Sequence, residues 1–165
     1  MTLGGHMDIE VTAAKHAHMP QLLELWKDLM DYHATIDPYF ERSAEGALHF
    51  ESFVSSLLLL EDARVIIAQD RVSGRAVGYC IAQITSRPPV FTRREHGFIT
   101  DMTVVPGLRR MGIGSLLLEH ALGWFREKKV DRVELNVIPR NEIGYSFWKK
   151  KGFRDYMHIV YLENP

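Results

Sequence analysis

The residues with the clearest chemical potential form a basic, glycine-rich turn. Arg109, Arg110, Gly112 and Gly114 follow an apolar run and lead into a helix predicted to start near Ile113. The first amides of a helix have no partner within it, and the helix dipole makes them electropositive. Because glycine has no Cβ, a phosphate can approach the backbone closely. The turn therefore predicts a site for an anion such as a pyrophosphate.

Two common phosphate-binding loops do not fit this turn. A Walker A loop needs lysine and then serine or threonine after its last glycine, whereas Ile113 and Gly114 follow Gly112. A dinucleotide-binding fingerprint needs a third glycine three residues after Gly114, and that position is Leu117. Both of these nucleotide-binding classes are therefore excluded.

The pattern Arg-x-x-Gly-x-Gly, from Arg109 to Gly114, resembles the acyl-CoA pyrophosphate loop of the GNAT N-acetyltransferase family. A second block, from Asn141 to Phe153, is similar to the family's Asn-x-x-Ala-x-x-Phe-Tyr-x-Lys-x-Gly-Phe. The two blocks have the family's order and spacing, and the resemblance covers nearly the whole chain. The alternative is a glycine-rich turn that only lets a helix pack closely on a sheet.

The resemblance implies acetyl-CoA as the donor and an amine as the acceptor. It implies that the pantetheine arm lies between two diverging strands and pairs with the first like an added strand. A backbone N–H of that strand would also stabilise the oxyanion that develops on the thioester. The residues it assigns to acetyl-CoA are Met102, Thr103 and Val104 on the strand, Arg109, Arg110, Met111, Gly112, Ile113, Gly114 and Ser115 at the pyrophosphate, and Asn141 and Trp148 in the second block.

Trp148 is a departure from the family, in which a tyrosine at this position can protonate the departing thiolate. An indole N–H does not act as an acid at physiological pH. Tyr145, one helical turn earlier, is predicted to take this role; the alternatives are water as the acid and Tyr145 as a packed aromatic residue. A thiol with a pKa of about 8.5 is a fair leaving group, so a dedicated acid is not essential.

The acceptor amine must lose a proton before it attacks, and a carboxylate near the central strand can accept it. Asp101 is the first candidate for this base, followed by Glu95 and His96. Asp101 could equally be a strand residue paired with the backbone or with an arginine. Direct transfer in a ternary complex is expected, because the single cysteine, Cys80, lies in an apolar strand and is predicted to be core.

The hydrophobic pattern predicts one mixed α/β domain. The resemblance implies the GNAT acyl-CoA N-acyltransferase fold, in which helices flank a mostly antiparallel sheet with one parallel, splayed pair. The chain between the predicted strands 97–105 and 133–138 forms a helix, and this arrangement implies a parallel pair with a right-handed crossover. The other strands are predicted at 9–13, 63–69, 76–85 and 157–162, the last closing the sheet. The first helix is predicted to open at residues 18–20 and to be broken by Asp37 and Pro38, and the other helices are predicted at 44–60, 113–129 and 142–150. The second helix is expected to be buried through Leu48, Phe53, Leu57 and Leu60.

The composition is that of an ordinary soluble globular protein, with 46% hydrophobic and 25% charged residues. Residues 8–165 suit a single domain, and residues 1–7 resemble a cloning remnant. No apolar run is long enough to span a membrane. A single cysteine fits a reducing compartment, so a cytoplasmic location is expected. No metal site is expected.

The net charge of −1 hides an asymmetry, because residues 19–62 carry −7 and residues 87–165 carry +5. This split suggests a cationic partner for the first half and a polyanion for the second, unless both are simply solvated faces. Nucleic acid is not expected, because the basic residues are dispersed. The predicted activity is N-acetylation of a small cationic primary amine. The alternatives are acetylation of a protein N-terminus or lysine, and a non-catalytic acyl-CoA-binding module; a homodimer is one option for assembly.

Overall fold

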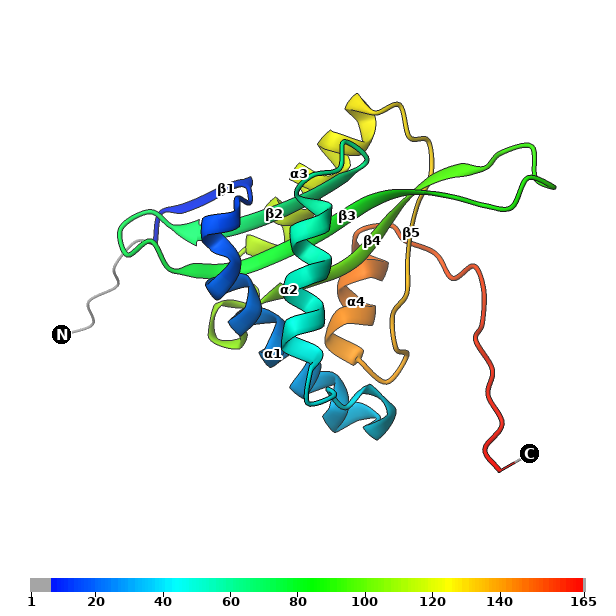
Figure 1. Ribbon diagram of the computed structural model, residues 1–165, viewed down its shortest axis with the longest axis horizontal. Helices are drawn as coiled ribbons and strands as arrows, with labels where there is room; N and C mark the ends of the chain where they lie inside the picture. The colour runs from blue at the N-terminus through cyan, green and yellow to red at the C-terminus, as the bar shows by residue number, and fades with distance from the viewer. Residues whose placement is uncertain (1–6, 165) are drawn as a thin grey trace.

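A five-stranded mixed sheet forms the centre of the protein in a computed structural model that describes residues 7–164 (Figure 1). The spatial order of the strands follows the chain: β1 (Ile9–Ala13), β2 (Ala63–Asp70), β3 (Ala76–Ser86), β4 (Glu95–Val104) and β5 (Val133–Leu135). Neighbouring strands are antiparallel except β4 and β5, which are parallel. The predicted mixed sheet with one parallel pair is confirmed. The proposed cloning remnant, residues 1–7, lies outside the described residues except for Met7.

Within residues 7–164, four α-helices flank this sheet, and the second is shorter at both ends than the predicted 44–60. They are α1 (Met19–Ile36), α2 (Gly46–Leu57), α3 (Ile113–Glu127) and α4 (Glu142–Lys150). Pro20 lies in the first turn of α1, where a missing amide costs nothing. The side chain of Asn141 caps α4 by accepting the Gly144 amide at 3.0 Å. After α4, Gly152 adopts a left-handed conformation with φ +89°.

Two apolar layers cover the two faces of the sheet. Helices α1 and α2 pack on one face against Val65, Ile67, Tyr79 and Ile81. Helix α3 packs on the other face, and its cluster includes Cys80 of β3. Adjacent residues of β3 therefore point to opposite layers, as the pleat requires. Burial raises the pKa of the Cys80 thiol, which agrees with its prediction as a core residue.

The buried face of α2 differs from the prediction. Phe50, Val54 and Leu57 are buried, whereas Leu48 and Leu60 are 61% and 56% exposed. The ring of Phe50 stacks on Trp26 at 4.8 Å and meets Tyr79 edge-on at 6.2 Å. The prediction of burial was correct for Leu57 and wrong for Leu48, Leu60 and Phe53, which is 37% exposed. The packing of Phe50 between α1 and β3 turns the helix so that Leu48 faces the solvent, and Leu60 lies beyond the end of the helix at Leu57.

The prediction that residues 157–162 close the sheet is wrong. This segment is irregular and lies at the surface, where its apolar side chains are 70–87% exposed. Strand β5 is therefore an edge strand, and it also ends three residues earlier than predicted, at Leu135. After Leu135 the chain no longer pairs with β4, and it then reaches Pro139, which has no backbone N–H to donate to a sheet.

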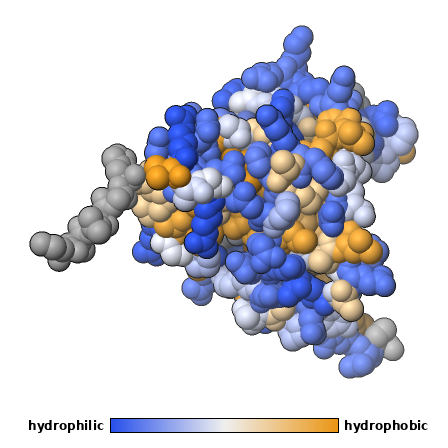
Figure 2. Space-filling view, turned by 60° about the vertical axis from the view of Figure 1, so that its left-hand side comes forward, coloured by the Kyte–Doolittle hydropathy of each residue, from blue (hydrophilic) through white to orange (hydrophobic). Residues whose placement is uncertain are grey.

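The face shown in Figure 2 is mostly hydrophilic, and its apolar side chains form small separate groups. Within the described part of the chain, none of the helices combines the length and the apolar character that crossing a membrane requires.

Candidate functional site

The turn before α3 has the geometry of an anion site. The first intrahelical bond joins the Leu116 amide to the Gly112 carbonyl at 3.0 Å, so the three preceding amides, of residues 113–115, have no helical acceptor. Among residues 7–164, no side chain caps them. Gly112 has φ +86°, and a Cβ added there would meet no atom within 4 Å. Arg110 also has a positive φ, of 63°. The electropositive end of α3 therefore faces open space.

The two sequence blocks meet beside the end of β4. A Cβ added to Gly114 would lie 3.4 Å from the Phe147 ring and 3.8 Å from Cγ2 of Val104. Gly114 thus brings the turn into close contact with both α4 and β4. One set of residues was predicted to hold the pyrophosphate, and the end of β4 was predicted to hold the pantetheine arm. The structure places the two next to each other.

Strand β4 has an open edge along this part of its length. Its pairing with β5 covers only Gly97 to Ile99, although β4 continues to Val104. Its other edge is paired with β3 as far as Val104, with an irregularity in register between Ile81 and Ala82. Among the described residues, the backbone of 101–104 therefore has no strand on the β5 side. An extended chain can add to such an edge through main-chain hydrogen bonds.

Tyr32 of α1 also reaches this region, although sequence reasoning did not identify it. Its hydroxyl donates to Oδ1 of Asn141 at 3.2 Å, and the Arg109 guanidinium lies 5.5 Å from its ring centre. Nε of Arg109 donates to the Val104 carbonyl at 3.3 Å. The three side chains converge where the β4 edge opens. Helical spacing could have indicated that Tyr32 faces the interior, because it follows the buried Leu25 and Leu29 by seven and three residues.

Asp101 lies at the start of the open edge and contacts one polar side chain. The hydroxyl of Tyr79 donates to Oδ2 of Asp101 at 3.3 Å. Burial raises the pKa of Asp101 from 3.8 to about 6, and the hydrogen bond from Tyr79 opposes this rise. Burial also raises the pKa of Tyr79, which therefore remains a donor. A carboxylate with a pKa near the working pH suits a general base.

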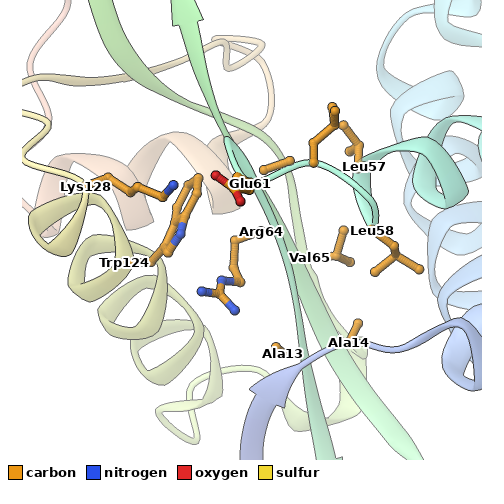
Figure 3. A pocket seen from close by; sticks show the side chains of 11 residues that line it. Ala13, Ala14, Leu57, Leu58, Glu61, Arg64, Val65, Trp124 and Lys128 are labelled. Carbon is orange, nitrogen blue, oxygen red and sulfur yellow. The ribbon is translucent and has the colours of Figure 1, made fainter.

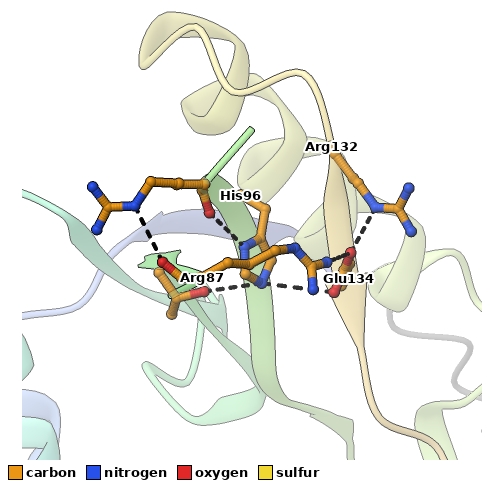
Figure 4. Close-up of polar contacts among 6 residues, drawn as sticks. Arg87, His96, Arg132 and Glu134 are labelled. Carbon is orange, nitrogen blue, oxygen red and sulfur yellow. Dashed lines mark hydrogen bonds and ion pairs between the residues drawn. The ribbon is translucent and has the colours of Figure 1, made fainter. Parts of the chain in front are cut away.

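The other candidate bases lie at the opposite end of β4. His96 is five residues from Asp101 along an extended strand, roughly 16 Å away. Its Nε2 lies 3.1 Å from Oγ1 of Thr85 and 3.6 Å from Glu134, which also binds Arg87 and Arg132 (Figure 4). Glu95 precedes His96 at the first position of the strand. The structure therefore does not bring these two residues together with Asp101.

The two aromatic candidates in α4 differ in their surroundings. The Tyr145 hydroxyl donates to both carboxylate oxygens of Asp155 at 3.0 Å, and Lys149 lies 5.7 Å from its ring centre. Trp148 is 9% exposed and packs edge-on against Phe147 and Phe153 in the α3 layer. Tyr145 is thus tied to the chain after α4, whereas Trp148 is part of the core.

A pocket of about 320 Å³ lies elsewhere, between α2, α3 and β2 (Figure 3). Trp124, Arg64, Glu61 and Lys128 line it, and the Arg64 guanidinium lies 5.9 Å from the Trp124 ring centre. It contains none of the predicted site residues. Within residues 7–164, no three His, Cys, Asp or Glu side chains lie close enough to hold a metal ion.

Solved structures share this fold. A tetramutant protein of Bacillus halodurans is 22% identical, with a TM-score of 0.83 over 93% of this chain and 98% of the other. The acetyltransferase AAC(6')-Iy, in complex with the bisubstrate analogue CoA-S-monomethyl-acetylneamine, is 17% identical, with a TM-score of 0.75 over 96% and 99%. An aminoglycoside antibiotic 6'-N-acetyltransferase of Acinetobacter haemolyticus is 18% identical, with a TM-score of 0.73 over 94% and 98%.

No curated protein matches this sequence significantly. A sequence model of the acetyltransferase (GNAT) family, however, matches residues 19–153. That range contains the basic turn, the open edge of β4, Asp101 and the α4 block. The chain therefore belongs to the acetyltransferase (GNAT) family.

Proposed function

We propose that this protein transfers the acetyl group of acetyl-CoA to a primary amine, and that the acceptor is a small cationic molecule. The observation that carries the proposal is the place of Asp101 at the start of an open strand edge that ends beside an uncapped, electropositive helix. One end of this arrangement suits a diphosphate, and the other suits a reacting amine.

The donor is proposed to bind along the turn and β4. The amides of Ile113, Gly114 and Ser115 hold the pyrophosphate, and Arg109, Arg110 and Gly112 complete the turn around it. The pantetheine arm pairs with residues 102–104, whose β5 side is open. Asn141 lies at this opening and offers amide hydrogen bonds to the arm. To bind there, the donor must replace the bond between Arg109 and the Val104 carbonyl.

The acceptor is proposed to lie on the α1 and α2 side of the sheet. Asp101 faces this side, because its partner Tyr79 packs against Phe50 of α2. The segment 19–62, which contains both helices, carries the net charge of −7. Negative potential at the entrance raises the local concentration of a cation. Solved structures of this fold that are named as aminoglycoside acetyltransferases also favour a small polyamine acceptor.

The reaction is proposed to be a direct attack within a ternary complex. Asp101 takes the amine proton, directly or through water, and the free nitrogen pair forms the C–N bond at the thioester carbon. A backbone N–H of β4 stabilises the oxyanion. The C–S bond then breaks, and the thiolate takes a proton from Tyr145 or from water. The buried Cys80 thiol takes no part.

A thiol-release assay with purified protein, acetyl-CoA and a panel of amines tests this proposal. Turnover of polyamines and aminoglycosides, but not of peptides, is the expected result. Turnover only of peptides, at their N-termini or lysines, would show that the acceptor is a protein and not a small molecule. Tight binding of CoA without turnover of any amine would support the non-catalytic reading, for which Trp148 is the main sequence argument.

A further inference from the structure

The pocket between α2, α3 and β2 lies far from the proposed acetyl-transfer site. Lys128, which lines it, follows the last residue of α3, whereas the basic turn precedes the first residue of that helix. At the rise of an α-helix, the two ends of α3 lie roughly 22 Å apart. The pocket volume of about 320 Å³ falls in the range of roughly 300–1,000 Å³ that is typical of small-molecule sites. This pocket is therefore a separate candidate site for a small ligand.

The pocket exists because β1 ends before it reaches the start of β2. The last residue of β1 pairs with Ile66, whereas β2 begins three residues earlier, at Ala63. Val65 still accepts one backbone hydrogen bond, of 2.8 Å, from the chain after β1. Among the described residues, 63 and 64 therefore have no strand on the β1 side. The ends of α2 and α3 lie on either side of this gap.

The two walls of the pocket come from these two helix ends. Figure 3 shows Leu57 and Leu58 of the α2 end on one side, and Trp124 and Lys128 of the α3 end on the other. The Lys128 ammonium lies 3.5 Å from Oδ1 of Asp62, so its charge is balanced within the protein. The leucines and the indole therefore offer an apolar ligand group a surface on both sides.

Arg64 and Glu61 lie between these walls, and each carries a charge that the protein does not balance. Within residues 7–164, neither side chain forms an ion pair, with each other or with any other residue. The Arg64 guanidinium lies over the Trp124 ring, 5.9 Å from its centre. Stacking on a ring leaves the in-plane N–H donors available, and their fork matches a carboxylate. One pocket thus holds an unpaired cation and an unpaired anion.

We propose that this pocket binds a free α-amino acid with an apolar side chain. Two N–H donors of Arg64 bind the carboxylate, Glu61 accepts hydrogen bonds from the ammonium group, and the side chain packs between the apolar walls. A simple anion would meet the like charge of Glu61, and a simple cation would meet that of Arg64. A zwitterion is complementary to both charges. For a ligand as small as leucine, we expect a dissociation constant on the order of 1 mM.

NMR titration of the full chain without acetyl-CoA tests this proposal. The chain has three tryptophans, so the three indole N–H resonances are easily followed, and the spectrum of Trp124→Phe identifies the one in the pocket. Leucine, methionine and phenylalanine are expected to shift the Trp124 resonance. Glycine is expected to bind about tenfold more weakly or less, because it has no side chain to bury between the walls.

Two analogues of leucine each remove one charge of the ligand. Leucinamide has no carboxylate and should bind at least about tenfold more weakly than leucine, since it loses charge-assisted hydrogen bonds. N-acetyl-leucine has no ammonium group. It should bind about two- to fivefold more weakly, because Glu61 is exposed and its ion pair is screened.

Arg64→Gln tests the contact from the side of the protein. It should weaken leucine binding at least about tenfold, yet leave leucinamide binding nearly unchanged, because leucinamide has no carboxylate to lose. Arg75→Gln is the matched control, since Arg75 is exposed in the β2–β3 turn, and it should bind leucine like the unchanged protein. The dispersion of the backbone amide resonances shows whether each variant is folded.

Three results would overturn the proposal. One is a Trp124 resonance that none of the amino acids shifts. Another is equal binding of leucine and N-acetyl-leucine, which would show that the site takes a plain anion. The third is unchanged leucine affinity in Arg64→Gln. None of these measurements requires turnover, so a failure here leaves the proposed acetyl transfer untouched, and an inactive enzyme leaves this site untouched.

Discussion

The hydroxyl of Tyr79 lies 3.3 Å from Oδ2 of Asp101, on the face of the sheet that α1 and α2 cover. Residue 101 pairs with Ile81 across β3 and β4, so Tyr79 is the diagonal neighbour of Asp101 on the same face. This relationship joins a fully buried donor to the candidate base at the start of the open β4 edge. Burial raises the pKa of Asp101 and the hydrogen bond from Tyr79 lowers it, so this contact tunes the pH dependence of the proposed reaction.

Activity is expected to fall at acid pH, because the base acts only as a carboxylate. With a pKa of about 6 for Asp101, kcat/KM should fall about tenfold per pH unit below about pH 6. Asp101→Asn should lower kcat by roughly 10²- to 10⁴-fold and remove this limb of the profile. Tyr79→Phe is the matched variant: the hydrogen bond lowers the pKa of Asp101, so its loss should move the limb to higher pH. A limb that stays in place in Asp101→Asn would identify another base.

The same carboxyl group is expected to cost stability at neutral pH. Its folded pKa of about 6 lies above its usual 3.8, so the folded state binds an extra proton between these values. The contribution to stability is therefore full below about pH 3.8 and is lost as the pH rises to about 6. Asp101→Asn should raise the free energy of unfolding at pH 7 by up to about 3 kcal/mol. Urea unfolding at pH 7 and pH 4 measures this, and an equal gain at both would contradict the explanation.

Ser115→Glu is expected to separate donor binding from folding. Ser115 is the third residue of α3, where an added carboxylate should stabilise the helix by about 0.3–1 kcal/mol. The same charge should weaken CoA binding at least about fivefold, because a like charge near the pyrophosphate costs on the order of 1–4 kcal/mol. Calorimetric titration with CoA and thermal unfolding measure the two effects. Gly112 is less suitable for this test, since its φ of +86° strains any side chain.

Ser115→Gln is the control for that experiment, because it has the length of glutamate without its charge. Binding by Ser115→Gln should be much closer to that of the unchanged protein. Equal losses in both variants would show that bulk, not charge, weakens binding. Unchanged binding in Ser115→Glu would place the pyrophosphate elsewhere.

Local patterns were sufficient to predict most elements, whereas the joint role of the two blocks in binding acetyl-CoA was implied by the family resemblance. The turn, cap and proline signals depend on neighbours in sequence, so they place the ends of α1 and α4 within one or two residues. The contact between Tyr32 and Asn141 joins residues 109 apart, and only the packing of α1 beside α4 creates it. Residues 157–162 have the composition of a strand, but composition does not show whether a strand partner is available.

The buried face of α2 shows another limit of the sequence. Apolar residues crowd the end of this helix, so two overlapping faces satisfy helical spacing. The choice between them depends on Trp26, which stacks on Phe50, and on Tyr79, which meets Phe50 edge-on; both are distant from it in sequence. Phe50 and Phe53 therefore differ in burial although both lie on apolar faces.

This difference predicts unequal costs for the same substitution. Phe50 is 5% exposed, so Phe50→Ala should lower the free energy of unfolding by about 3–5 kcal/mol. Phe53 is 37% exposed, and Phe53→Ala should cost less than about 1 kcal/mol. Chemical unfolding of the two variants measures both costs. Similar costs would mean that α2 is rotated from the orientation described above.

Two tyrosine-to-phenylalanine variants distinguish leaving-group chemistry from donor positioning. Tyr145 already donates to Asp155 at 3.0 Å, so Tyr145→Phe should lower kcat less than about threefold, with water protonating a thiolate of pKa about 8.5. A loss of about 100-fold would instead identify Tyr145 as the acid.

Tyr32→Phe removes the hydrogen bond that orients Asn141. The free energy of one such bond corresponds to about a 2- to 12-fold rise in the KM for acetyl-CoA, with kcat little changed. A lower kcat with an unchanged KM would place the Tyr32 hydroxyl at the reacting atoms, where it would supply the proton that Trp148 cannot.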